Sequence, residues 1–292
     1  MKPLTALLTC LLLNLAAATS YPLTITDDLG RQITIESEPS RLVTMLPSHT
    51  ETLCALGRCD SILGTDTFST YPASVEALPK LGDLYSPNIE GIIALDPDLV
   101  LIGEDDELAS ALSKAGLTVY AGNAQRYEEL LEKITTLGQM VNREEAAGRI
   151  NLQIRVTVAG LASLLGNSAT PSIYYEISNE YYSPGPASFI GVLISSAGGQ
   201  NIVPEGIGDF PKLDNEFIIA TNPDIIILSD APYGESIETV KARAGWDDLD
   251  AVREGRVVPL TQEQVDTLSR PGPRVIEAVL LLAQILHPEL LE

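Results

Sequence analysis

The sequence has few of the residues that build metal and redox sites. Its 292 residues include two histidines, His49 and His287, and three cysteines. Zinc and manganese sites need several histidine and carboxylate ligands, so a site for either metal is nearly excluded. The chain has no C-x-x-C motif, which argues against a zinc-binding or redox role for the cysteines.

Positive charge is also scarce. The chain has 18 Lys and Arg residues against 40 Asp and Glu residues, and its formal net charge is -22. Such a surface repels phosphate backbones and anionic lipid head groups, so we expect no nucleic-acid partner. The simplest consequence of the charge is solubility.

The common catalytic signatures are missing as well. The sequence contains no G-x-S-x-G elbow, no phosphate-binding G-x-x-x-x-G-K loop and no dinucleotide-binding G-x-G-x-x-G turn. Ser48 and His49 invite a hydrolase interpretation, but adjacent residues rarely present a nucleophile and its base to each other. We therefore expect that the protein is not an enzyme. An exported enzyme is the less favoured alternative.

The N-terminus has the pattern of a targeting segment. Lys2 is followed by the apolar run Leu4 to Leu15, which polar residues interrupt, and by Ala16-Ala17-Ala18, which fits a cleavage site. The run is too short for a membrane span of about 20 residues. We expect residues 1–20 to be a signal peptide and the mature protein to be exported. Lipid attachment at Cys10 is not expected, because almost no apolar segment would precede it.

The mature chain keeps two cysteines, Cys54 and Cys59, at the end of a predicted helix. Export makes a disulfide possible. Two readings stay open, a local bridge between the two cysteines or two buried free thiols.

The most informative feature of the sequence is a stretch that occurs twice, at residues 88–102 and 214–228. Both copies have a capping residue, a short helix with glutamate at its second position (Glu90 and Glu216), a Pro-Asp turn and a buried strand. The two glutamates are 126 residues apart, too far for a solenoid repeat of roughly 20–50 residues. The repetition predicts two similar lobes.

Alternating strand and helix patterns predict the α/β class, with two Rossmann-like lobes that have mostly parallel sheets. No proline interrupts residues 143–165, so one long helix of about 35 Å is expected to join the lobes. The expected division is an N-terminal lobe at 21–142, a connecting helix at 143–167 and a C-terminal lobe at 168–292. Ligands of such sheets sit in the loops beyond the carboxyl ends of the strands, so we expect a ligand cleft between the lobes.

Two local patterns are more specific. Leu23 to Ile35 alternates around Gly30, which predicts a β-hairpin. The strand 41–46 is expected to lead into a loop at 47–50, with a helix from Glu51 to Leu56.

In their order and spacing, several stretches resemble the periplasmic substrate-binding proteins of ABC importers with a rigid helical backbone. The nearest group carries cobalamin, haem and ferric siderophores, and the motifs are most similar to its cobalamin-binding branch. The resemblance covers most of the mature chain, although no single piece is specific. The resembling stretches are 41–57, 64–72, 78–90, 94–100, 188–202 and 270–274.

The resemblance implies partners. In this family one exposed glutamate on each lobe docks into arginine pockets of a dimeric membrane permease, which works with a cytoplasmic ATPase. Glu90 and Glu216 stand at the matching positions, and the binding protein itself is expected to be a monomer. The alternative is that the two glutamates have no docking role, because the helix dipole alone favours a glutamate in the first turn by about 0.3–1 kcal/mol. A role in sensing instead of import stays open.

The cleft is expected to hold a large, flat cargo between aromatic walls, with a few polar groups to orient it. His49 is a candidate axial ligand for haem iron or cobalt, or an ordinary loop residue. Arg270 and Lys80 are the only cations expected there, which favours cobalamin over haem or a ferric siderophore. No cofactor of its own is expected. The candidate ligand-binding residues are Ser48, His49, Phe68, Tyr85, Tyr181, Tyr182, Phe210, Tyr233 and Arg270.

Overall fold

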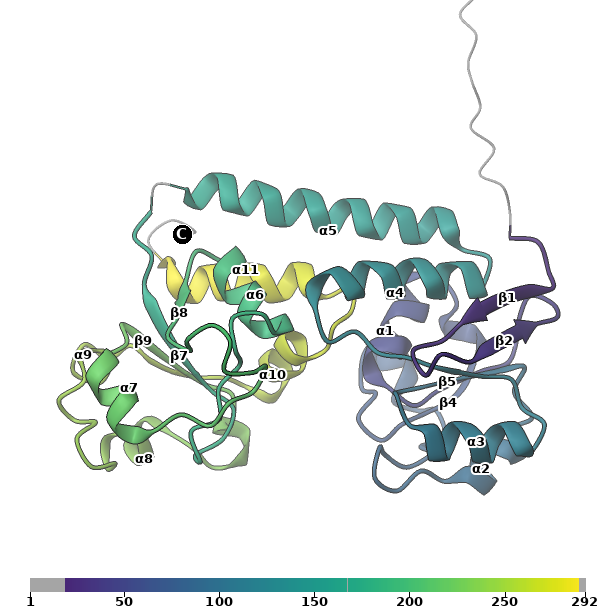
Figure 1. Cartoon of the computed structure of the whole chain (residues 1–292), viewed down its shortest axis with the longest axis horizontal. Coiled ribbons are helices and arrows are strands. Elements are labelled where there is room, and N and C mark those ends of the chain that lie inside the picture. Colours follow the sequence, from purple (N-terminus) through teal and green to yellow (C-terminus); the bar gives the residue numbers. More distant parts are fainter. Residues whose placement is uncertain (1–18, 167, 289–292) are drawn as a thin grey trace, which may run out of the picture.

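The computed structural model describes residues 19–166 and 168–288 and shows two lobes beneath one long helix, α5 (Glu144–Leu165) (Figure 1). Each lobe is built on a four-stranded sheet whose strands are all parallel. This confirms the predicted fold class. Within the described ranges, no helix combines the length and apolar character needed to cross a membrane.

The first lobe begins with a hairpin of β1 (Leu23–Thr26) and β2 (Gln32–Ile35), which turns at Gly30 with φ +76° as predicted. Its parallel sheet has the order β4-β3-β5-β6. The strands are β3 (Leu42–Thr44), β4 (Ile62–Thr65), β5 (Leu99–Ile102) and β6 (Val119–Ala121). The helices are α1 (Pro47–Ala55), α2 (Ile89–Ala94), α3 (Asp106–Lys114) and α4 (Tyr127–Met140).

The second lobe repeats this topology. Its sheet has the order β8-β7-β9-β10, so in both lobes the first strand lies between the second and the third. The strands are β7 (Ser172–Glu176), β8 (Gln200–Asn201), β9 (Ile225–Leu228) and β10 (Val257–Pro259). The helices are α6 (Phe189–Ser196), α7 (Asn215–Thr221), α8 (Ile237–Lys241), α9 (Asp250–Arg253), α10 (Gln262–Ser269) and α11 (Val275–Leu286).

The repeated stretch forms the same unit in each lobe, α2 with β5 and α7 with β9. Both helices are followed by a residue in the left-handed region, Asp96 at φ +46° and Asn222 at φ +47°. Asp and Asn adopt this conformation more readily than other non-glycine residues. The proline that follows each of them cannot continue the helix. The sequence repeat is therefore a repeat of backbone conformation.

The aspartate of each Pro-Asp pair holds the start of the neighbouring strand. Asp98 accepts hydrogen bonds from the backbone N–H groups of Ser40 and Arg41, and Asp224 accepts them from the N–H and hydroxyl of Ser172. Burial opposes ionisation of both carboxyls, but these hydrogen bonds outweigh it and hold the pKa of Asp98 and of Asp224 below the usual range. Each repeat thus fixes the register of its own sheet.

A hydrophobic core runs from one lobe into the other beneath α5. One cluster of buried side chains includes Leu42 of β3, Ile227 of β9 and residues of α4, α6 and α11. The buried residues of α5 are Ala147, Ile154, Leu161 and Leu165, a narrow stripe with a spacing near seven. The stripe packs on helices of both lobes, so α5 is a shared part of the core rather than a free linker.

One local prediction was wrong. The predicted loop at 47–50 is the first turn of α1, which starts at Pro47. Proline fits the first helical position because its missing N–H has no intrahelical partner there. The consequence is that Ser48 and His49 are helical and buried rather than in a loop.

The two mature-chain cysteines form a bridge. Cys54, in the last turn of α1, is joined to Cys59 by a disulfide bond. Of the two readings that the sequence left open, the local bridge is the one that the structure shows.

Candidate functional site

An apolar hollow with a volume of about 470 Å³ lies in the second lobe. Its residues come from β7, from the loops that follow β7 and β9, from α6 and α10, and from the loop that contains Phe210. This is the switch point of the sheet, where the strands on either side of β7 connect in opposite directions. The lining residues are Tyr175, Ile177, Ser178, Tyr182, Ile190, Phe210, Ser229, Tyr233, Val265 and Ser269.

Three of the predicted aromatic residues meet at this hollow. Tyr182, Phe210 and Tyr233 are 39%, 54% and 77% exposed, so their rings still have apolar surface to cover. Buried Tyr175 contributes from the strand below. The lining contains aromatic, aliphatic and hydroxyl side chains and no charged one. Such a surface suits a flat, largely neutral ligand with a few hydrogen-bonding groups.

A group of acidic residues lies behind the hollow. Glu176, the last residue of β7, is buried and receives two hydrogen bonds from Arg243, at 2.5 and 2.6 Å. Arg243 also bonds Glu235 at 2.8 Å. Asp230 follows Ser229 of the hollow, is 6% exposed, and neither of its carboxylate oxygens has a hydrogen-bond partner in the described structure. Burial, with Glu176 beside it, raises the pKa of Asp230 to about 7.

Replacing Asp230 by asparagine should stabilise the protein at pH 8 by about 1–3 kcal/mol, because it removes an unpartnered buried carboxylate. The folded-state pKa of about 7 lies above the ordinary 3.8, so the folded state binds the proton more tightly. That stabilisation is complete below about pH 4 and is lost as the pH rises through 7. Thermal unfolding of the wild type should therefore move to lower temperature between pH 5 and 8. This decrease in unfolding temperature should be smaller in Asp230→Asn than in the wild type. It should equal that of the wild type in Asp247→Asn, a control at an exposed position.

The structure does not bring Ser48 and His49 to the hollow. His49 is 3% exposed, and its ring centroid lies 6.4 Å from that of Tyr120, inside the first lobe. Burial lowers the pKa of His49 to about 4, so the imidazole is neutral at pH 7. An axial ligand must offer a nitrogen to the cargo. In this structure His49 offers none to the cleft.

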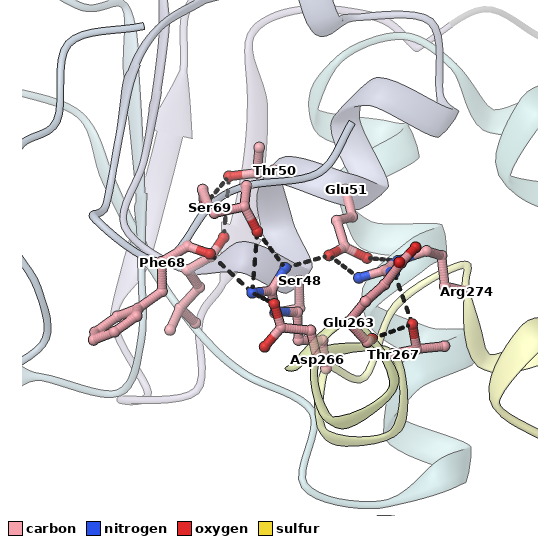
Figure 2. A network of polar contacts seen from close by, with 12 residues as sticks. Ser48, Thr50, Glu51, Phe68, Ser69, Glu263, Asp266, Thr267 and Arg274 are labelled. Atoms are coloured by element: carbon pink, nitrogen blue, oxygen red, sulfur yellow. Dashed lines mark hydrogen bonds and ion pairs between the residues drawn. The ribbon is translucent and has the colours of Figure 1, made fainter. Parts of the chain in front are cut away.

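The remaining aromatic candidates have different environments. Tyr181 stacks on Trp246 at 5.9 Å between ring centroids and packs in the core of the second lobe. Tyr85 is 90% exposed, beside the turn at Asp83. Phe68 is 60% exposed, and Figure 2 shows its ring pointing away from the polar network described next. None of the three lines the hollow.

A buried polar network joins the two lobes (Figure 2). Glu51 of α1 accepts hydrogen bonds from Arg270 at 3.0 Å and from two nitrogens of Arg274 at 2.9 and 2.8 Å. The exposed fractions of Glu51, Arg270 and Arg274 are 3%, 9% and 6%. The carboxylate belongs to the first lobe and both guanidinium groups belong to the second. One glutamate therefore connects the two lobes.

Both Nη groups of Arg270 already have hydrogen-bond partners. Besides Glu51, it bonds Asp266 at 2.6 Å and the carbonyl oxygen of Phe68 at 2.9 Å. It also lies 3.4 Å from the hydroxyl of Thr70. The sequence suggested Arg270 as a ligand-binding cation, and in the structure its guanidinium joins the second lobe to Glu51 and Phe68 of the first. Its partner Glu51 was missed, because nothing in the local sequence distinguishes it from an ordinary helix glutamate.

The two candidate docking glutamates occupy equivalent places. Glu90 and Glu216 are both exposed and both stand at the second position of their helices, α2 and α7. No hydrogen bond or ion pair from either side chain is found within residues 19–166 and 168–288. In Figure 1 both helices lie away from α5, one on each lobe.

Comparison with known proteins gives a consistent set of relatives. Residues 42–264 match the family described as periplasmic binding protein. The uncharacterized ABC transporter substrate-binding lipoprotein YvrC of Bacillus subtilis is 31% identical over 280 residues, covering 92% of this chain and 87% of the relative. The cobalamin-binding protein of Halobacterium salinarum is 30% identical over 282 residues, covering 92% and 75%.

Among solved structures, the periplasmic haem-binding protein RhuT of Roseiflexus sp. RS-1 in its apo form is similar, with a TM-score of 0.76. The match has 24% identity and covers 86% of this chain and 99% of that one. At this identity the likeness shows the fold alone.

Proposed function

This chain belongs to the periplasmic binding protein family, and we propose that it captures cobalamin outside the cytoplasm and delivers it to an ABC import permease. The cargo proposal is supported by the cobalamin-binding relative from Halobacterium salinarum. The single observation that carries it is the hollow of the second lobe, which has exposed aromatic rings and no charged side chain in its lining. A corrinoid ring system with amide side chains matches that chemistry better than a polyanion does.

The charges around the cleft support the same cargo. A second hollow, of about 370 Å³, is shared by the two lobes. Asp209 of the second lobe lines it together with residues of the first lobe. Its lining has more carboxylates than cations, and Lys133 is already paired with Asp28. Lys212, near the ring of Tyr182, is paired with Glu180 at 3.2 Å. An anionic cargo would have to compete with these carboxylates.

Phe210→Ala and Tyr233→Ala should each weaken cobalamin binding by about 1–3 kcal/mol, because each removes an aromatic surface that the ligand would cover. Affinity should depend little on salt, since salt screens exposed charges over about 8–10 Å. The measurement is titration with cobalamin followed by absorbance at low and high ionic strength. Leu152→Ala, at an exposed apolar position of α5, is the control that should leave affinity unchanged. Full affinity in both aromatic variants would remove the aromatic-wall proposal.

The second candidate cargo is haem or a ferric siderophore. The fold shared with the haem-binding RhuT makes haem the natural comparison ligand. The same titration with haem and with a ferric siderophore separates the candidates. Tight binding that falls steeply with ionic strength would favour an anionic iron chelate over cobalamin.

The proposed partners are a permease dimer and its cytoplasmic ATPase, contacted through Glu90 and Glu216. The Bacillus subtilis relative is named as a substrate-binding component of an ABC transporter, which supports this class of partner. The expected signal peptide and Cys10 lie outside the described residues. That relative is named a lipoprotein, so mass spectrometry of the exported protein is the measurement that decides between cleavage near Ala18 and lipid attachment at Cys10.

A further inference from the structure

The buried network at the base of the cleft balances its charges. It holds two arginines, Arg270 and Arg274, and two carboxylates, Glu51 and Asp266. Glu51 contacts both arginines, at 3.0 and 2.8 Å, and Asp266 contacts Arg270 at 2.6 Å. The network is therefore neutral as a whole, although a single arginine in the same place would be a strong anion site.

The position of Arg270 makes this neutrality matter for cargo. Arg270 directly follows Ser269, which lines the hollow of the second lobe. On its other side it bonds the carbonyl oxygen of Phe68 in the first lobe. Arg270 therefore links the chain segment that borders the hollow to the Phe68 loop of the first lobe. A cargo held between the lobes would bring its own charged groups close to this point.

We infer that Glu51 and Asp266 are specificity-determining residues, which occupy Arg270 and so exclude anionic cargo from the base of the cleft. This rests on the proposed function of the cleft as the cargo site. A cargo carboxylate that takes the Nη hydrogens of Arg270 must displace Glu51 or Asp266 from them, and the displaced carboxylate loses its ion pair with Arg270. Such a competing cost discriminates between ligands without any contact to the favoured one.

Removing one carboxylate should turn the neutral network into an anion site. Glu51→Gln and Asp266→Asn keep the size of the side chain but leave two arginines with one carboxylate. Each variant should bind haem about tenfold more tightly than the wild type does, because a charge-assisted hydrogen bond to a propionate becomes available. The gain should shrink at high salt. The side chain of Asp266 is more exposed than that of Glu51, so Asp266→Asn should disturb folding less than Glu51→Gln does.

Two controls identify the source of the gain. Haem dimethyl ester lacks the propionate charges, so its affinity should not change in either variant. Adding Arg270→Gln to Asp266→Asn should return haem affinity to the wild-type value, because Arg274 keeps Glu51 as its partner. Glu107→Gln removes a charge at an exposed position of α3, outside the network, and should have no effect.

The measurement is haem titration by absorbance on the full-length exported protein, with circular dichroism to show that each variant is folded. A folded Asp266→Asn or Glu51→Gln protein with wild-type haem affinity overturns the inference, as does a gain in Asp266→Asn that survives the addition of Arg270→Gln. Cobalamin titration of the wild type reports separately on the proposed cargo. Its failure would leave the comparison of haem affinities between variants intact.

Discussion

Glu51→Ala should lower the free energy of unfolding by about 3–5 kcal/mol, the largest loss of stability that we expect from one exchange in this chain. The substitution takes away three hydrogen bonds from Arg270 and Arg274 and leaves two buried arginines without their shared carboxylate. The measurement is equilibrium unfolding in urea, followed by tryptophan fluorescence and by far-UV circular dichroism.

The loss should also change the form of the transition. Trp246 reports on the second lobe, whereas circular dichroism reports on both lobes. If Glu51 couples the lobes, the two signals should separate in the variant and coincide in the wild type. The matched control is Glu277→Ala, which replaces an exposed glutamate of α11 and should change stability by less than about 0.5 kcal/mol. Equal stability of the two variants would show that the network does not hold the lobes together.

Replacing Glu90 and Glu216 together by alanine should abolish capture of the cognate permease while cargo affinity and folding stay nearly intact. Both side chains are exposed at helix starts, where a charge contributes at most about 1 kcal/mol to stability. At an interface the loss is larger, because removing one partner of a desolvated charge pair costs several kcal/mol. The measurement is pull-down of the detergent-solubilised permease, combined with a cobalamin titration of each variant.

The chain offers matched controls for this docking experiment. Glu107 and Glu238 are exposed glutamates at the second position of α3 and α8, one on each lobe. Their double replacement removes the same charge from the same kind of helix position outside the repeated unit, and it should leave permease capture unchanged. Single replacement of Glu90 or Glu216 should give an intermediate loss. Normal capture by the Glu90/Glu216 double variant would reduce these residues to ordinary helix-start glutamates.

The sequence by itself determined the local structure and its repetition. The hairpin of β1 and β2 turns at Gly30, and α5 fills the proline-free run that ends at Leu165. The duplicated Pro-Asp stretch predicted two similar lobes. Capping residues, prolines and β-branched runs determine the backbone conformation of residues near them in the sequence, so the same stretch forms the same structure twice. The same stretch placed Glu90 and Glu216 at equivalent helix positions.

Only the tertiary structure decided which of the candidate side chains line a common hollow and which are buried or paired. Arg270 is a plausible cation for cargo until Glu51, 219 residues earlier, is seen to neutralise it. His49 follows a strand at the end where ligands bind, yet the helix that begins at Pro47 turns it into the lobe. Of the aromatic candidates, Tyr182, Phe210 and Tyr233 meet at one hollow while Tyr181 packs on Trp246. Backbone conformation follows from neighbours in sequence, whereas burial and charge pairing depend on residues that only folding brings together.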